Sequence, residues 1–367
     1  MFENLVNSDA LFLVAGPCSA ESETQLRDTC EALMCSSSVS LLRCGVWKPR
    51  TRPGGFEGAG EEALKWISAL KREHPSWHFA TEVATAEHVE LALRYGIDVL
   101  WLGARTTANP FLVAEIAGAL RGMAVPVMVK NPVNPDVKLW MGAIERLQQV
   151  GLQDLAAVHR GFSRAAATIS HEFRNDPLWE VPIELRRAMP QLPLLCDPSH
   201  LGGRREMIAM LSQTALNLDF DGLMVECHVH PEQALTDARQ QLTPADLFAM
   251  LQGMKYLKRS GNVVGYIPKE LTVLREQMNI VDDELLHLVE QRLAISQQIA
   301  AVKARNGMTI YQPRQWNRKL KHSLEKAREL GLDESFVREL FVQLHMASIK
   351  RQNEPVHSPL PPKEGAN

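Results

Sequence analysis

Residues 78–104 read HFATEVATAEHVELALRYGIDVLWLGA. Two short apolar runs, 78–83 and 98–104, enclose a segment whose apolar residues fall at helical spacing. Continuous apolar runs, in contrast to alternating ones, are typical of strands buried on both faces of a parallel sheet. This stretch therefore predicts a strand, a helix and a second strand parallel to the first.

The same alternation continues on both sides of this stretch. The short apolar runs fall at 11–17, 40–48, 78–83, 98–104, 126–132, 156–161, 193–200 and 222–229. Eight strand–helix units in about 250 residues predict a (β/α)8 TIM barrel of the α/β class. An open, doubly wound sheet is the alternative fold.

The composition is that of an ordinary globular protein. Of 367 residues, 45% are hydrophobic and 23% charged, and the net charge is −3. This charge argues against a nucleic-acid partner. No apolar run is long enough to span a membrane, and no secretory leader is visible. The six cysteines are irregularly spaced, which favours reduced thiols and a cytoplasmic location.

The chain is predicted to contain two domains. The barrel should occupy 1–258, and the glycines and proline of RSGNVVGYIPKE predict a linker at 259–268. From there to 354 the pattern is all-helical. The Pro-rich, polar residues 355–367 predict a disordered tail.

Cationic residues gather where the predicted strands end. In a barrel these carboxyl ends form the active-site face. So many like charges require anionic ligands, and arginine suits phosphate or carboxylate through its bidentate fork. The residues concerned are Arg43, Lys48, Arg50, Arg105, Lys130 and Arg160.

A second set of residues from strands 1, 7 and 8 has the chemistry of metal ligands. It consists of Cys18, His200, Glu226 and Asp237. Thiolate, imidazole and carboxylates together suit a divalent transition metal, with Mn²⁺ the first expectation and Fe²⁺, Co²⁺ or Zn²⁺ suited to the same ligands. The other five cysteines are interpreted as structural.

These residues stand in motifs that resemble the type I 3-deoxy-D-arabino-heptulosonate 7-phosphate (DAHP) synthases. The motifs are GPCS, KPRTRP, GARTT, DPSH and MVECH, and the resemblance covers about residues 10–258. GGFEG and GEEAL resemble the branch with a minimal barrel. The resemblance implies a metal-dependent condensation of phosphoenolpyruvate with erythrose 4-phosphate. The sister enzyme that uses arabinose 5-phosphate is the rival, and KPRT favours the erythrose enzyme.

The resemblance also implies a role for each site residue. The four residues of the second set would bind the metal, and Lys48 would be catalytic. Glu82 or the region of Asp197 and His200 would relay protons. The phosphate of phosphoenolpyruvate would contact the Ala104 backbone, Arg105, Lys130 and Arg160. The carboxylate of phosphoenolpyruvate would face Arg43, Lys48 and Lys130. The second substrate, erythrose 4-phosphate, would contact Arg50, Thr51 and Thr106.

Residues 270–305 predict one long helix with a coiled-coil-like apolar seam. Arg292 occupies the one seam position that is not apolar. It is either a register-setting residue or an anion-binding arginine. Lys303 lies 11 residues on, within about 20° of the same face, whereas Arg275 lies about 100° round the helix. We therefore expect Arg275 to reach another site, in a partner subunit.

Residues 267–354 resemble the all-helical chorismate mutases. Arg275, Arg292, Lys303, Ser348 and Gln352 match that family's substrate-binding positions. The resemblance implies that the first arginine enters the partner's site, and hence a homodimer. The arginines suit the two carboxylates of chorismate, while Lys303 and Gln352 suit its ether oxygen.

The second helix of this region departs from the family pattern. Gln312 stands where an acidic residue is commoner, Gln315 where arginine is, and Trp316 where glutamate is. Gln312 can still bind the substrate hydroxyl. Two hypotheses follow: a bifunctional enzyme, or a synthase whose helices only sense ligand or dimerise the chain. In either case the resemblance implies feedback inhibition by prephenate or chorismate. A barrel that serves only as a scaffold is a third, non-enzymatic reading.

Overall fold

The computed structural model describes residues 1–2, 5–6, 11–48, 54–163, 173–255 and 268–353. The chain forms two compact units, Met1–Val264 and Gly265–Asn367. The predicted linker at 259–268 lies outside the described residues except for Pro268, and the tail 355–367 lies wholly outside them. The predicted domain boundaries therefore stay a prediction.

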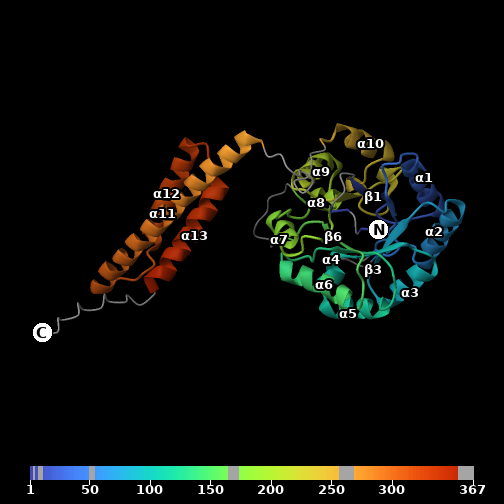
Figure 1. Cartoon of the computed structure of the whole chain (residues 1–367), viewed down its shortest axis with the longest axis horizontal. Helices are drawn as coiled ribbons and strands as arrows, with labels where there is room; N and C mark the ends of the chain where they lie inside the picture. Colours follow the sequence, from blue (N-terminus) through green and yellow to red (C-terminus); the bar gives the residue numbers. More distant parts are fainter. Residues whose placement is uncertain (3–4, 7–10, 49–53, 164–172, 256–267, 354–367) are drawn as a thin grey trace. The chain divides into compact units, whose positions relative to one another are not determined.

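The first unit is a closed barrel of eight parallel strands in sequence order (Figure 1). Strand β1 pairs with β8 over five residues, from Phe12 opposite Gly222 to Gly16 opposite Glu226. This closure confirms the predicted TIM barrel and excludes the open sheet. The strands are β1 (Phe12–Gly16), β2 (Leu41–Arg43), β3 (Phe79–Val83), β4 (Val99–Leu102), β5 (Val127–Lys130), β6 (Leu155–His159), β7 (Leu194–Cys196) and β8 (Gly222–Glu226).

Helices surround the barrel because each carries one apolar stripe toward the strands. Several begin with a side-chain cap: Ser22, Thr85 and Asp136 each accept a hydrogen bond from a backbone N–H three residues on. The helices are α1 (Glu23–Met34), α2 (Glu61–Glu73), α3 (Ala86–Arg94), α4 (Ala104–Thr107), α5 (Pro110–Ala119), α6 (Val137–Gln149), α7 (Glu180–Ala188), α8 (Pro198–Gly202), α9 (Ile208–Asn217) and α10 (Pro244–Gly253), with 3₁₀ turns η1 (Arg205–Met207), η2 (Pro231–Gln233) and η3 (Ala238–Gln240).

The barrel has two apolar layers. One lies between the sheet and the helices, and the other fills the lumen with residues such as Val14, Trp101 and Met128. Phe2 belongs to the luminal layer and meets Phe12 edge to face, with ring centroids 5.6 Å apart. The lumen is thus a packed core, and polar chemistry is confined to the carboxyl ends of the strands.

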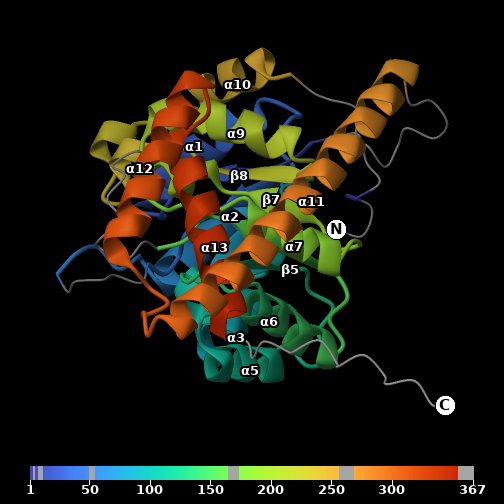
Figure 2. The same cartoon turned by 90° about the vertical axis from the view of Figure 1, so that its left-hand side faces the viewer.

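The second unit consists of three helices, α11 (Lys269–Arg305), α12 (Pro313–Glu329) and α13 (Glu334–Asn353). The predicted long helix at 270–305 is confirmed. Helix α13 packs against both α11 and α12, as Figure 2 shows. Gly331 adopts a φ of +69° in the turn between α12 and α13, a conformation that glycine adopts without strain.

Little apolar surface is buried within this second unit. Its compact cluster consists of Leu324, Ala327 and Val337, with Leu320 and Phe341 packed against it. The predicted seam on α11 is exposed from Leu274 to Val302 in the single chain. Within the described part of the chain, no helix is both long and apolar enough to cross a membrane.

Candidate active sites

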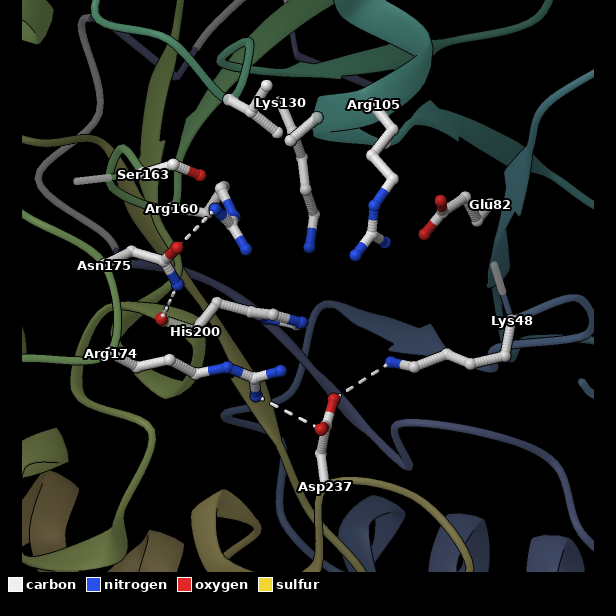
Figure 3. A pocket seen from close by; sticks show the side chains of 13 residues that line it. Lys48, Glu82, Arg105, Lys130, Arg160, Ser163, Arg174, Asn175, His200 and Asp237 are labelled. Atoms are coloured by element: carbon white, nitrogen blue, oxygen red, sulfur yellow. Dashed lines mark hydrogen bonds and ion pairs between the residues drawn. The ribbon is translucent and has the colours of Figure 1, made fainter. Parts of the chain in front are cut away.

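A cavity of about 480 Å³ opens at the carboxyl ends of the barrel strands (Figure 3). Its lining includes five cationic side chains and only two carboxylates. The cations are Lys48, Arg105, Lys130, Arg160 and Arg174, and the carboxylates are Glu82 and Asp237. Such a positive, partly desolvated space suits small phosphorylated or carboxylated molecules.

The deepest cation of this cavity is already paired. Lys130 ends β5, and its ammonium lies 2.7 Å from Oδ2 of the buried Asp197. Burial lowers the pKa of Lys130, and Asp197 opposes that effect. Burial would raise the pKa of Asp197, but His200 and Lys130 hold it well below its usual range. The pair therefore presents a charged ammonium to the cavity.

Three expected metal ligands lie together beside this cavity. One ligand atom from each of Cys18, Glu226 and Asp237 lies within 4.8 Å of the others. The Lys48 ammonium lies 2.6 Å from the Cys18 sulfur and 3.2 Å from Asp237 Oδ2. A cation thus already contacts two members of the set. Thiol and two carboxylates are a donor set that fits a divalent transition metal.

His200 lies next to this set but outside the group of three. Its Nδ1 lies 2.8 Å from Asp197 Oδ2, and its Nε2 lies 3.7 Å from Glu226 Oε1. A carboxylate that accepts from Nδ1–H fixes the tautomer and leaves the Nε2 lone pair for a metal. The structure therefore brings Cys18, Glu226 and Asp237 together, and His200 as the fourth ligand stays a prediction.

Further contacts hold the two carboxylates. Arg43 Nη2 and Gln240 Nε2 donate to Glu226 at 3.0 and 2.6 Å. Burial would raise the pKa of Glu226, but His200, Arg43 and Lys48 outweigh it and hold this pKa at about 2. Asp237 has a φ of +46°, a conformation that is uncommon outside glycine and is concentrated at functional sites.

Burial, followed by the charge of Glu226, raises the pKa of the Cys18 thiol to about 12. The pKa of the neighbouring Lys48 is raised as well, although burial acts on it in the opposite direction. Burial would lower the pKa of Lys48, but Cys18, Glu226 and Asp237 raise it above its usual value. Lys48 is therefore a protonated acid at neutral pH.

Two neighbours determine how the Glu82 side chain lies in the cavity: Trp101 on β4 and Gly103 directly after β4. The indole N–H of Trp101 donates to Glu82 Oε2 at 3.1 Å. A Cβ at position 103 would lie 2.1 Å from Glu82 Oε1, so any larger residue there would displace the Glu82 carboxylate. Trp101 also lies under two cations, with Arg43 at 5.2 Å and Lys130 at 5.8 Å from its ring centroid. Sequence reasoning gave no role to Trp101 because it resembles an ordinary core residue.

Two further lining residues were missed from the sequence. Arg174 lies 3.1 Å from Asp237 Oδ1, and Asn175 Oδ1 accepts from Arg160 Nη1 at 2.8 Å (Figure 3). Burial is the main cause that lowers the pKa of Arg160 to about 10. Both residues come from the long connection after β6, where no periodicity marks them. In the structure, Gly161 and Gly203 allow Asn175 and Arg174 to approach closely, so these two glycines are the sequence feature that could have pointed to the segment.

Not every predicted barrel residue reaches the cavity. Lys48, Ala104, Arg105, Lys130, Arg160, His200 and Asp237 line it. Arg43 is buried, 2% exposed, and Thr106 is 5% exposed; neither lines the cavity. Arg50 and Thr51 lie outside the described residues.

The helical unit has its own cavity, of about 630 Å³. All the predicted mutase residues except Arg275 line it: Arg292, Lys303, Gln312, Ser348 and Gln352. Arg292 Nη1 donates to Ser348 Oγ at 2.6 Å and to Leu344 O at 2.8 Å. Lys303 donates to the carbonyl of Ile310. The shared face of Arg292 and Lys303 predicted from helix geometry is thus present.

Several polar atoms of this cavity are buried without a hydrogen-bond partner in the described part of the chain. They are Arg292 Nε, His345 Nε2 and Gln352 Oε1. Lys319 and His345 also line the cavity, and neither was predicted. His345 stacks on Trp316 with ring centroids 4.0 Å apart and planes 8° apart. The arrangement is a cationic cavity with unused donors and acceptors.

Together these features define the class of the protein: a TIM barrel with a cationic mouth beside a group of potential metal ligands, in one chain with a helical unit that has a second cationic cavity. Residues 6–261 match the DAHP synthetase I family, and residues 274–353 match chorismate mutase type II. The chain belongs to the DAHP synthetase I family and carries a C-terminal chorismate mutase domain.

Known proteins agree with this assignment. The phospho-2-dehydro-3-deoxyheptonate aldolase of Thermotoga maritima is 31% identical over 246 residues, 67% of this chain and 69% of that one. A 2-dehydro-3-deoxyphosphooctonate aldolase of Geobacter sp. strain M21 is 27% identical over 67% of this chain and 91% of its own length. The crystal structure of the Thermotoga maritima DAHP synthase superposes with a TM-score of 0.58 at 28% identity, covering 66% of this chain and 67% of that one.

The chain is thus a bifunctional shikimate-pathway enzyme, with a transferase and an isomerase in one polypeptide. The predicted recognition of both domains is confirmed. The scaffold reading, in which the barrel has no enzymatic role, is wrong.

Proposed function

We propose that the barrel condenses phosphoenolpyruvate with erythrose 4-phosphate in a metal-dependent reaction. Cys18, His200, Glu226 and Asp237 would hold the metal, with Mn²⁺ the first expectation. A divalent metal supplies a Lewis acid at the aldehyde oxygen of the sugar. The clustering of three of these ligand atoms within 4.8 Å, with His200 Nε2 beside Glu226, supports this ligand set.

Phosphoenolpyruvate would bind through its two anionic groups. Its phosphate would lie against Arg105, Lys130 and Arg160, with the Ala104 backbone N–H as a further donor. Its carboxylate would face Lys48 and Lys130. The buried Arg43 supports binding of the carboxylate at this place, since Arg43 Nε and Nη1 have no hydrogen-bond partner among the described residues.

The residues then have distinct chemical tasks. The methylene carbon of phosphoenolpyruvate attacks the aldehyde carbon, and a carbon–carbon bond forms. Lys48, protonated in this setting, donates a proton to the alkoxide that develops. Water adds to the former enol carbon, and the phosphate leaves. Glu82, which reaches the same cavity, is placed to accept the proton of that water.

Erythrose 4-phosphate is proposed as the second substrate, contacting Arg50, Thr51 and Thr106. Relatives named for the octulosonate reaction make arabinose 5-phosphate the rival. The KPRT sequence at 48–51 favours the erythrose enzyme. Synthase rates with each sugar phosphate, at equal concentration, test this choice. A higher kcat/KM with arabinose 5-phosphate would overturn it.

The helical unit is proposed to convert chorismate to prephenate. Arg292 would bind one carboxylate, while Lys303 and Gln352 would stabilise charge on the breaking ether oxygen. Ser348 and Gln312 would bind the remaining polar groups. Arg275 does not line the cavity, so Arg275 of the partner subunit would complete the site in a homodimer. The exposed apolar seam of α11 supports such a dimer.

One observation carries the mutase proposal: Arg292, His345 and Gln352 line one cationic cavity, and each has a buried polar atom without a hydrogen-bond partner among the described residues. The test is chorismate loss with the full-length protein and with Arg292→Ala. Prephenate formed at an enzymatic rate by the wild type, and lost in the variant, would support the proposal. No turnover by the wild type would leave the helices as a ligand sensor or dimeriser.

The sensor is the alternative function of the helical unit, favoured by Gln315 and Trp316 in place of the commoner residues.

In both cases we propose that prephenate or chorismate inhibits the synthase. An effector acts only through different contacts in two states. Synthase rates measured with saturating prephenate decide the matter, and an unchanged rate would refute feedback control.

A further inference from the structure

The helical cavity contains more positive charge than its recognised residues explain. Arg292, Lys303 and Lys319 line it, together with His345. Among the described residues that line this cavity, none is an aspartate or glutamate. Chorismate carries two carboxylates, so its binding would neutralise charges that the protein itself leaves unneutralised.

Lys319 stands one helical turn after Gln315 and three residues after Trp316 on α12. Residues three and four apart share one helix face, so Lys319 projects from the face that Gln315 and Trp316 occupy. All three side chains line the same cavity. Position 315 carries the uncharged Gln315, and the positive charge of Lys319 lies one helical turn further along α12.

The electrostatic setting of Lys319 agrees with its position. Lys319 remains exposed to solvent, but partial burial and then the charge of Arg292 lower its pKa. Both cations line one cavity, so an anion between them would relieve their repulsion. Arg292 already donates to Ser348 and Leu344, and Lys303 to Ile310, whereas no hydrogen bond of the Lys319 ammonium is found in the described part of the chain.

We propose that Lys319 binds one of the two carboxylates of chorismate, in place of a cation at position 315. The inference rests on the proposed mutase function of this cavity. The second carboxylate goes to Arg292. The stacked rings of Trp316 and His345 line the same cavity as Lys319 and connect α12 to α13 there.

The test compares three variants of the full-length protein. Lys319→Ala removes the ammonium and Lys319→Arg retains the charge. Lys321→Ala is the matched control, because Lys321 is on the same helix, 80% exposed, paired with Glu325 at 3.9 Å and outside this cavity. A hydrogen-bonded ion pair with substrate corresponds to about 10- to 100-fold in binding. We expect the KM for chorismate to rise by that factor in Lys319→Ala, with kcat changed less.

Each outcome decides one question. Partial rescue by Lys319→Arg and a wild-type KM in Lys321→Ala would support the proposal, whereas a wild-type KM in Lys319→Ala would overturn it. Synthase activity reports that each chain is folded. If the wild type has no mutase turnover, the mutase proposal fails, and calorimetry with prephenate replaces kinetics. If Lys319→Ala then binds prephenate more weakly than the wild type and Lys321→Ala do, the proposed role of Lys319 in carboxylate binding stands. If Lys319→Ala binds prephenate as tightly as the wild type, or if the wild type does not bind prephenate, that role is refuted.

Discussion

The two sites of this protein treat charge in opposite ways. In the barrel, the most deeply buried cations have anionic partners within the chain: Lys130 lies 2.7 Å from Asp197, and Arg43 lies 3.0 Å from Glu226. In the helical unit, Arg292 donates to a carbonyl and to the Ser348 hydroxyl, and no carboxylate of the described residues lines the cavity. The barrel site is preorganised by its own residues, whereas the helical site awaits an anion.

The two sites also differ in how much of their surroundings is buried, and the barrel site is again the more complete one. The barrel site stands on strand ends above a packed lumen, where Glu226 and Asp197 are fully buried. The helical unit buries a small cluster and leaves the α11 seam exposed, with Leu285 at 54%. A row of exposed leucines and isoleucines is costly in water. We infer that the barrel folds as a complete site and that the helical unit needs a second chain.

Metal removal should separate the two sites most sharply. A Lewis acid contributes several kcal/mol to such a reaction, so chelation should lower the synthase rate by about a thousandfold. The mutase rate should stay within about twofold, because the described residues that line the helical cavity include no thiol or carboxylate. Rates with and without dipicolinate, and after Mn²⁺ is restored, measure both effects.

Cys18→Ala is the matched variant, since it removes one ligand without a chelator. It should reproduce the synthase loss and spare the mutase. A fully active synthase after exhaustive chelation would contradict the metal assignment.

Hybrid dimers should show whether the helical site is shared between chains. Arg275→Ala and Arg292→Ala should each lower mutase activity by about a hundredfold, because each removes a charged contact to substrate. A hybrid of the two chains has one intact site if Arg275 serves the partner subunit. Hybrids purified through two different tags should therefore regain about half of the wild-type mutase rate.

The synthase rate is the internal control for these dimers, because neither arginine belongs to the barrel. A hybrid no more active than its parents would show that Arg275 does not act across the dimer.

The sequence predicted the barrel and most of its mouth for a physical reason. Strand ends of a closed parallel barrel must meet at one face, so Lys130 and His200 could be placed together without any contact information. Helix geometry likewise placed Arg292 and Lys303 on one face of α11. Within a regular strand or helix, the backbone geometry fixes the direction of each side chain. The place of a residue in the sequence then predicts the face or strand end at which its side chain lies.

Prediction failed where irregular chain or side-chain packing sets the position. Arg174 and Asn175 reach the cavity from a connection without periodicity. Lys319 and His345 lie on regular helices, but their meeting depends on how α12 and α13 pack, which the spacing within one helix does not encode. Trp101 resembled a core residue, and only its contact with Glu82 reveals a role.

Two buried tryptophans allow a direct test of that role. Trp101 donates to the Glu82 carboxylate and Trp140 to the Val129 carbonyl, each at 3.1 Å. Trp101→Phe should lower synthase kcat by about tenfold, the worth of a hydrogen bond to a charged group, with little change in the KM for phosphoenolpyruvate. Trp140→Phe should cost stability but leave kcat unchanged. Equal kcat losses in both variants would make Trp101 merely structural.

The smallest expected effect concerns proton uptake at the helical site. Burial, followed by the charges of Arg292, Lys319 and Lys303, lowers the pKa of His345, so the ring is neutral in the free protein. A bound dicarboxylate offsets those charges and raises the pKa of His345, so the complex binds a proton that the free protein does not. Prephenate affinity should therefore increase as pH falls from 8 toward 6, by about threefold.

His345→Phe separates this proton from the packing, because phenylalanine retains a ring against Trp316 and has no titrating group. Calorimetry at several pH values should find the pH dependence of prephenate affinity in the wild type and not in the variant. An unchanged pH dependence in His345→Phe would mean that a group other than His345 takes up the proton.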